Sequence, residues 1–200
     1  MQIKALLLSV VVAGALNVPL AAAERPGVPA GWSAAGQVGK QFEVGYDEQE
    51  GAVYLRSLGE PGEQLGALTQ TIDARPYIRQ TLMLSAEVKT EDPKVRAELF
   101  MRTVGPKPGT QTGESVNSGA GWNAGKDWTE TKVQVGGMVD EQTRSLDFGL
   151  VLQGKGKVWI RNVRLVPLGP VVVQASNMPL HMAIDVAPSV GRAVNLTLRP

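Results

Sequence analysis

The sequence contains no cysteine and a single histidine, His181, among its 200 residues. Without cysteine the chain forms no disulfide, no thiolate nucleophile and no Cys-ligated zinc or iron–sulfur site, and it carries no lipid on an N-terminal cysteine. One histidine leaves little scope for a metal centre or a Ser–His–Asp triad. The sequence also has neither a Gly-x-Ser-x-Gly elbow nor a phosphate-binding glycine loop ahead of a helix. We therefore expect a protein that is not an enzyme.

An excess of charge of either sign is also missing. Lys and Arg together number 20, and Asp and Glu number 19. One of the cations, Lys4, lies in an N-terminal segment that we expect to be removed, which leaves the mature chain neutral overall. Nucleic acids and anionic membranes attract clustered Lys and Arg side chains. The balance therefore predicts that neither of them is the partner.

The longest apolar run is confined to the N-terminus. Lys4 precedes the apolar run Ala5 to Leu16, and Ala21-Ala22-Ala23 stands just before Glu24. This order is typical of a secretory signal peptide, and the run is shorter than the ~20 residues of a bilayer span. We expect residues 1–23 to be removed and the exported protein, periplasmic or secreted, to begin near Glu24 without a membrane span. A buried N-terminal helix is the alternative.

Beyond Glu24, short alternating apolar runs separated by Gly, Pro, Asn and Asp predict β-strands. Eight strands are expected: Gln41 to Tyr46, Ala52 to Ser57, Gly66 to Ile72, Tyr77 to Lys89, Val95 to Val104, Trp128 to Val135, Ser145 to Gln153 and Lys157 to Val166. Strands at this spacing, with no long amphipathic helix between them, predict an all-β fold. The architecture we expect is a two-sheet antiparallel β-sandwich of the jelly-roll type.

Two stretches lack the strand pattern. Gly105 to Lys126 is rich in Gly, Pro, Ser, Thr and Asn, which predicts a long surface loop. After Leu168-Gly169-Pro170 the alternation weakens and further prolines follow. We expect the sandwich domain to span residues 24–169, and residues 170–200 to form a C-terminal extension. That extension either docks on the sandwich, adds an edge strand or stays partly mobile.

The order of these motifs resembles the galactose-binding-domain-like jelly rolls, which include the carbohydrate-binding modules of bacterial glycanases. The similar stretches lie between residues 30 and 168 and include Gly51-Ala52-Val53-Tyr54-Leu55-Arg56-Ser57, Ala97-Glu98-Leu99-Phe100-Met101-Arg102, Asp127-Trp128-Thr129, Phe148-Gly149-Leu150 and Gly156-Lys157-Val158-Trp159-Ile160-Arg161. The resemblance implies a non-catalytic module that binds a polysaccharide or oligosaccharide without a cofactor.

Members of this group often carry two acidic residues in the closing strand, where they support a structural calcium ion. This chain has Arg161-Asn162 at that place. Calcium prefers several hard oxygen ligands, and Asn162 offers only one neutral carbonyl. The resemblance therefore gives a structural calcium ion weak support, and we predict no metal site.

Alternation on the predicted strands places polar and aromatic side chains on shared faces. Phe100 shares a face with Arg102, and Trp159 faces a groove if Val158 and Ile160 face the core. Alternation alone leaves the reverse arrangement of Trp159 open. Aromatic rings stack on sugar rings, and Arg and Gln hydrogen-bond hydroxyl groups. The sequence therefore predicts one ligand-binding strip on one sheet, composed of Tyr54, Arg56, Gln70, Phe100, Arg102, Gln153 and Trp159.

Two alternatives stay open. The arginines of this strip can instead pair with acidic neighbours on a solvated face. The domain can also be an envelope protein-interaction or structural domain without a glycan ligand, with the Gly105 to Lys126 loop and residues 170–200 as its contact elements.

Two other features are interpreted as structural. Trp128, at the start of a predicted strand, is interpreted as a core residue. Asp47, Glu48 and Glu50 form the only tight acidic run. Its spacing fits no calcium loop, so we interpret it as a solvated turn.

Overall fold

The computed structural model describes residues 24–107, 111–112, 116–118, 125–134, 138–169 and 196–198. These residues form strands and one short 3-10 turn. The elements are β1 (Glu24–Pro26), β2 (Ser33–Gly36), β3 (Phe42–Asp47), β4 (Ala52–Ser57), β5 (Leu65–Asp73), η1 (Arg75–Tyr77), β6 (Thr81–Thr90), β7 (Arg96–Val104), β8 (Val116–Asn117), β9 (Thr129–Gln134), β10 (Ser145–Gln153) and β11 (Lys157–Gly169).

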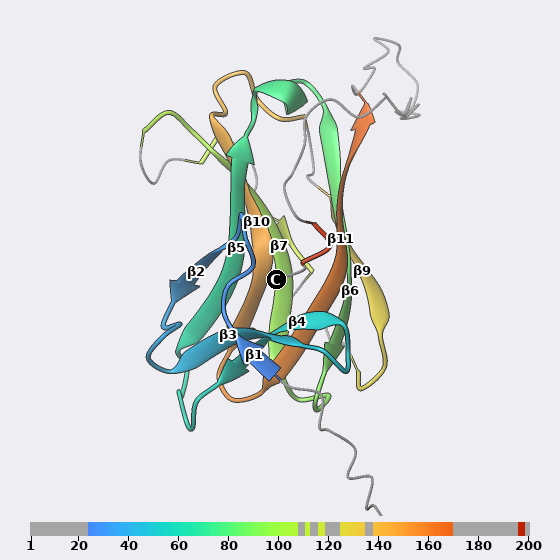
Figure 1. The fold of residues 1–200 in the computed structure, drawn as a ribbon. Coiled ribbons are helices and arrows are strands. Elements are labelled where there is room, and N and C mark those ends of the chain that lie inside the picture. The colour runs from blue at the N-terminus through green and yellow to red at the C-terminus, as the bar shows by residue number, and fades with distance from the viewer. Residues whose placement is uncertain are drawn as a thin grey trace, which may run out of the picture.

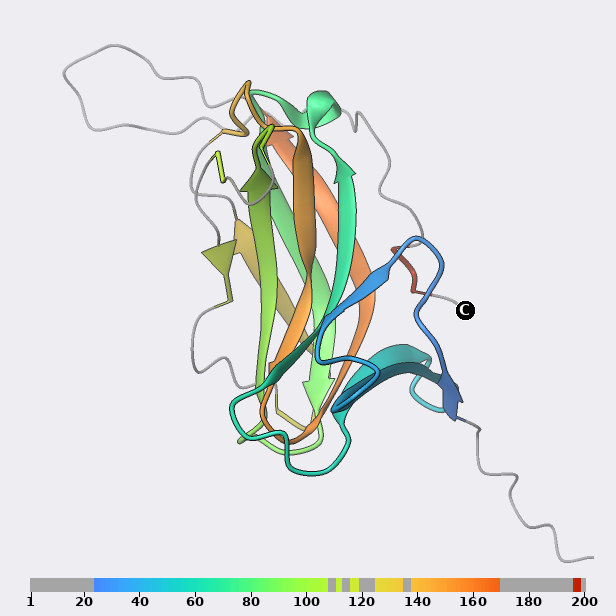
Figure 2. The same cartoon turned by 90° about the vertical axis from the view of Figure 1, so that its left-hand side faces the viewer.

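The strands form two antiparallel sheets that lie face to face (Figure 1). One sheet has six strands in the order β1-β3-β4-β11-β6-β9, and the other has five in the order β2-β5-β10-β7-β8. Figure 2 shows the second sheet from its outer side, with the β3–β4 hairpin crossing one end of the sandwich. The predicted fold class, a two-sheet antiparallel β-sandwich of jelly-roll type, is confirmed.

All eight predicted strands are present, and β4 and β10 have the predicted bounds. The strand predicted from Tyr77 begins only at Thr81, because Pro76 and Tyr77 belong to η1, where proline fixes a turn conformation. Three strands, β1, β2 and β8, were not predicted. They are two to four residues long, too short for a period of two to be visible.

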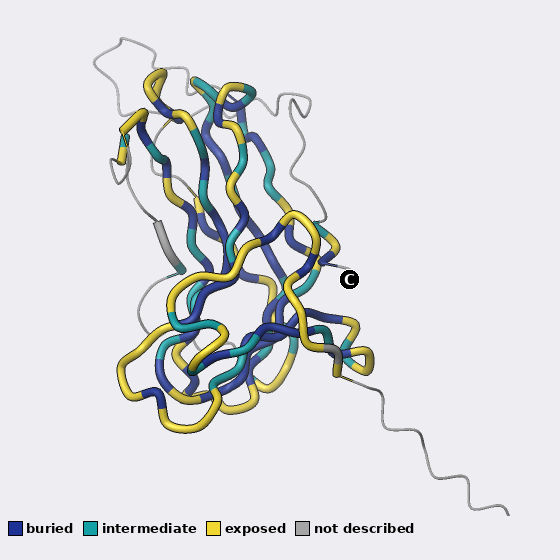
Figure 3. Tube along the Cα trace, turned by 60° about the vertical axis from the view of Figure 1, so that its left-hand side comes forward, coloured by how far each residue is buried: buried dark blue, intermediate teal, exposed yellow. Residues whose placement is uncertain are grey.

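The core lies between the sheets and is built from one face of each long strand. On β7 the inward residues Ala97, Leu99 and Met101 are buried, whereas Phe100 between them is half-buried on the outer face. Figure 3 shows this alternation of buried and more exposed positions along the strands. Trp32, just before β2, is also buried and packs edge-on against Phe148 of β10, with ring centroids 5.8 Å apart.

The described part of the C-terminal extension docks on the sandwich. Leu198 is fully buried in the main core, and Leu196 packs against it. Figure 1 places this segment, in red, between the sheets, and Figure 2 shows that it sits at the edge of the sandwich. Residues 1–23, 170–195 and 199–200 lie outside the described residues, so the domain boundaries stay predictions. Within the described part of the chain, no helix has the length and apolar character of a membrane span.

Candidate functional site

The outer face of the six-stranded sheet carries a second, smaller apolar cluster, which we call the Trp159 cluster. It consists of Ala52, Tyr54 and Trp159, with Trp128 packed against it. Val158 and Ile160 are fully buried in the main core, so Trp159 points outward. This is the first of the two orientations that alternation left open for Trp159. Trp128 therefore belongs to this outer cluster, and its interpretation as a main-core residue is wrong. Only 9% of Trp159 and none of Tyr54 is exposed.

Cationic side chains cover the rings of this cluster. The Lys157 ammonium lies 4.3 Å from the Trp159 ring centroid and 4.5 Å from that of Tyr54. Lys89 lies 5.1 Å from the Trp159 centroid, and the Arg161 guanidinium lies 3.9 Å from the Trp128 centroid. Cations are attracted to the negative faces of aromatic rings, and the contact is stronger when water is excluded. The ring faces that a sugar would need are therefore already occupied.

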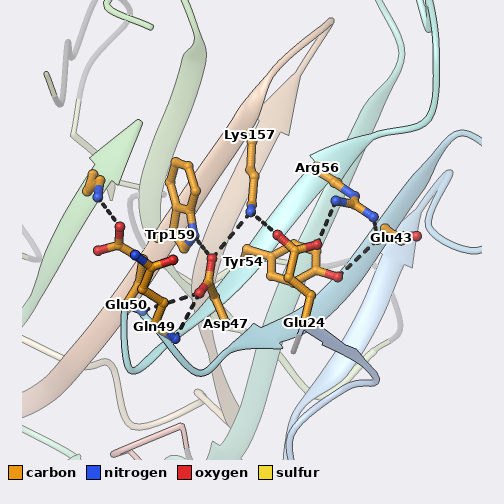
Figure 4. A network of polar contacts seen from close by, with 10 residues as sticks. Glu24, Glu43, Asp47, Gln49, Glu50, Tyr54, Arg56, Lys157 and Trp159 are labelled. Carbon is orange, nitrogen blue, oxygen red and sulfur yellow. Dashed lines mark hydrogen bonds and ion pairs between the residues drawn. The ribbon is translucent and has the colours of Figure 1, made fainter. Parts of the chain in front are cut away.

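Asp47, the last residue of β3, contacts both Trp159 and Lys157 (Figure 4). It accepts a hydrogen bond from the Trp159 indole N–H at 2.9 Å and lies 3.5 Å from the Lys157 ammonium. Burial by itself raises the pKa of Asp47, but the hydrogen bonds from Trp159 and the Glu50 amide, with the charge of Lys157, outweigh it and lower the pKa. Asp47 is 8% exposed, so the interpretation of this acidic run as a solvated turn is wrong at Asp47.

A second carboxylate, Glu24, ties the N-terminal strand to the same network. Glu24 accepts contacts from Lys157 and from Arg56, each at 2.7 Å. Arg56 also pairs with Glu43, which accepts a hydrogen bond from the Tyr54 hydroxyl at 3.0 Å. Burial, and then the bond to Glu43, raises the pKa of Tyr54 to about 12. The acidic pairing of Arg56 that the sequence left open is therefore present, with Glu24 and Glu43 as its partners.

Arg161 and Asn162 of β11 stand where the resemblance led us to look for acidic residues. The pairing of β11 with β6 shifts by one residue between Arg161 and Arg164, which is a β-bulge. Arg161 and Asn162 each hydrogen-bond the Glu87 carboxylate, at 2.8 and 2.9 Å, and these bonds lower the pKa of Glu87, the Asn162 bond most. A guanidinium in this place repels a calcium ion, so these residues do not fit a calcium site. The described residues contain no group of three or more metal-ligating side chains.

The outer face of the five-stranded sheet has a different character. Phe100 stands opposite Gly149 of β10, which stands opposite Thr69 of β5. A Cβ atom on Gly149 would lie 2.0 Å from the Leu68 carbonyl oxygen, so this position cannot hold a side chain. Phe100 is therefore a half-buried outer aromatic ring beside a position that has no side chain.

Polar groups flank Phe100 on the next row of the same face. Arg102, 49% exposed, donates to the Asp147 carboxylate at 2.7 and 2.9 Å, and Thr71 donates to its other oxygen at 2.7 Å. In the opposite direction along β10, Gln153 donates to Glu63, which also pairs with Arg96. Hydroxyl, carboxylate, guanidinium and amide groups are therefore available on both sides of the ring.

The seven residues of the predicted strip do not lie on one sheet. Tyr54, Arg56 and Trp159 belong to the six-stranded sheet, and the other four belong to the five-stranded sheet. Sequence alternation shows which side chains share a face of one strand, but it does not show which strands share a sheet. The prediction of a single strip is therefore wrong. The structure brings Tyr54, Arg56 and Trp159 together on the outer face of one sheet, and Phe100, Arg102 and Gln153 on the outer face of the other.

The Gln70 side chain lies on neither outer face. It is 2% exposed, lies between inward-facing Leu68 and Ile72, and donates a hydrogen bond to the Gly31 carbonyl at 3.2 Å. Burial argues against ligand contact by Gln70 and by Tyr54. Three residues of the Phe100 face, Thr71, Asp147 and Gly149, were missed. Alternation from Gln153 along β10 reaches Gly149 and Asp147 in steps of two, so this pattern could have identified these two residues.

No protein-family model and no curated protein sequence matches the chain. Solved structures with a similar fold include the CBM22-1–GH10 modules of the Clostridium thermocellum endo-1,4-beta-D-xylanase 10B complexed with xylohexaose, at 12% identity and a TM-score of 0.53. The match covers 73% of this chain and 28% of that one. The enzymatically active domain of bacteriophage CBA120 tailspike protein 4 is similar at 15% identity and a TM-score of 0.50, over 69% of this chain and 19% of that one.

The CBM22-1 xylan-binding domain of Paenibacillus barcinonensis Xyn10C matches 74% of this chain and 94% of its own, at 14% identity and a TM-score of 0.48. This chain thus spans a small part of the two larger proteins and nearly all of the isolated module. At these identities the likeness concerns the fold. The resemblance to carbohydrate-binding jelly rolls is confirmed at that level.

Proposed function

We propose that this chain is an exported, non-catalytic β-sandwich that binds a polysaccharide or oligosaccharide across the outer face of its five-stranded sheet. The observation that carries the proposal is the row of Phe100, Gly149 and Thr69, in which an aromatic ring stands beside a position without a side chain. A pyranose has an apolar face that stacks on such a ring, and the glycine adds no side chain that would obstruct it.

Other rows of the same outer face supply the polar part of the recognition. Arg102, Asp147 and Thr71 offer donors and acceptors on one side, and Gln153 offers an amide on the other. The similar fold of modules solved with xylohexaose supports a glycan as the ligand. The Trp159 cluster has a different role in this proposal. Asp47 joins β3 to Trp159 and Lys157 of β11, and Lys157 also pairs with Glu24 of β1.

The first prediction concerns Phe100. The purified protein is retained on at least one of a panel of insoluble xylan, cellulose, chitin and peptidoglycan. We expect Phe100→Ala to weaken retention about tenfold, because the stacking contact is lost while Phe100, on the outer face, is not part of the main core. Circular dichroism of both proteins checks the fold, and retention is measured by pull-down over a range of polysaccharide concentrations.

A matched variant on the opposite sheet is Trp159→Phe, which keeps an aromatic ring and removes the hydrogen bond to Asp47. We expect it to lower thermal stability and to leave retention unchanged. If Trp159→Phe weakens retention and Phe100→Ala does not, the binding site lies on the six-stranded sheet, and the proposed site is wrong. A wild-type protein that no glycan retains would overturn carbohydrate binding and direct the search to protein partners.

A further inference from the structure

A hollow of about 540 Å³ opens at the end of the Phe100 face, where β5 ends and β10 begins. Its lining consists of Thr71, Ile72, Asp73, Arg75, Arg144 and Ser145. Thr71 pairs in register with Asp147, and Asp73 with Ser145, so the hollow continues the row of polar groups that begins beside Phe100. A ligand that lies along this face would reach it.

Arg144 is the residue of the hollow whose charge forms no ion pair within the described part of the chain. Its backbone is fixed on both sides, because its amide donates to the Val104 carbonyl at 2.8 Å and its carbonyl accepts from the Ala74 amide at 3.0 Å. Its side chain is exposed and makes no ion pair with any residue in the described ranges. Three other arginines at this end, Arg75, Arg79 and Arg102, each pair with an acid.

The acids nearby do not neutralise Arg144. Asp73 is held by the Arg75 side chain and amide, and Asp147 is held by Arg102 and Thr71. Asp140, in the turn before Arg144, accepts the Gln142 amide at 2.7 Å. The lining itself contains two arginines and one aspartate, a net charge of +1. A guanidinium with free donors forms bidentate hydrogen bonds with carboxylate and sulfate groups.

We propose that this hollow is a subsite for an anionic substituent, a carboxylate or a sulfate ester, on the glycan that the sheet face binds, with Arg144 as the residue that contacts it. The Thr71 and Ser145 hydroxyl groups lie on the same lining and supply further hydrogen bonds. The inference rests on the proposed function, because the glycan backbone must lie on the Phe100 face. It adds a preference for acidic polysaccharides over neutral ones.

The test compares polysaccharides that share a backbone and differ in charge. Polygalacturonate is compared with its methyl-esterified form, and dextran sulfate with dextran, by affinity electrophoresis of the whole protein. We expect Arg144→Gln to weaken the interaction with the charged member of one pair about tenfold and to leave the neutral member unchanged. The pair that responds distinguishes a carboxylate from a sulfate.

Arg79→Gln is the matched control, since it removes the same charge from the same end of the molecule. Arg79 pairs with Glu141 and is not part of the lining. An equal loss in Arg144→Gln and Arg79→Gln would show general electrostatic attraction and overturn the subsite. A loss in Phe100→Ala without one in Arg144→Gln would overturn the subsite and leave the proposed function standing. Absence of binding to every polysaccharide would overturn both.

Discussion

At the scale of single residues, the two outer faces show how burial decides what an aromatic side chain does. Trp159 and Phe100 both alternate with core residues, and both point away from the main core. Lys157 and Lys89 cover the Trp159 ring, whereas Phe100 stands beside a glycine. The covered Trp159 ring therefore stabilises its sheet, and Phe100 is the ring that we propose stacks on a sugar.

Asp47 gives a prediction at this scale. Its pKa is lowered below the ordinary value of 3.8, so its contribution to stability is fully present above pH 3.8 and is lost as the pH falls through the folded-state value. We expect Asp47→Asn to lower the free energy of unfolding by about 1–3 kcal/mol at pH 7, because Trp159 and Lys157 lose their charged partner. The difference in unfolding free energy between Asp47→Asn and wild type should become smaller below pH 3.8. Urea unfolding at pH 7 and pH 3 measures it.

Asp127→Asn serves as the control, because Asp127 is an exposed aspartate. Its unfolding free energy is expected to stay within about 0.5 kcal/mol of wild type at both pH values. A gap between Asp47→Asn and wild type that is equal at pH 7 and pH 3 would contradict the assigned role of the Asp47 charge.

At the scale of elements, the closing strand and the C-terminal segment complete the sandwich. β11 pairs with β4 only over Lys157 to Ile160, although it pairs with β6 along most of its length. The remainder of its β4-facing edge has no strand partner among the described residues. Leu198 is buried in the main core and Leu196 packs against it, and Figure 2 shows this segment at the edge of the sandwich.

Leu198 gives the prediction for this segment. We expect Leu198→Ala to lower the free energy of unfolding by about 2–5 kcal/mol, because it removes buried methyl groups and leaves a cavity. Leu58→Ala is the same chemical change at a site that is 46% exposed, and it should change stability by under about 0.5 kcal/mol. Thermal or urea unfolding compares the two. Equal effects in both variants would show that the C-terminal residues are not part of the core.

At the scale of the whole molecule, Glu24, at which we expect the exported protein to begin, belongs to β1 and contacts Arg56 and Lys157. Cleavage after Ala23 would leave this strand and the Glu24 contacts with Arg56 and Lys157 whole. We expect N-terminal sequencing of the protein from the exported fraction to start at Glu24. An intact Met1, or a first residue beyond Pro26, would contradict this prediction.

The sequence by itself determined the fold class and most strands, because alternation with a period of two follows directly from the geometry of an extended chain. Alternation also showed which side chains of a strand share a face, and on β7 this placed Phe100 with Arg102 on the outer one. The outward orientation of Trp159 on β11 was decided only by the tertiary structure. Only the tertiary structure decided that β4 and β11 belong to one sheet and β5, β7 and β10 to the other. That assignment depends on strand pairing between residues distant in sequence, such as Gly149 opposite Phe100 and Thr69, which no local pattern encodes.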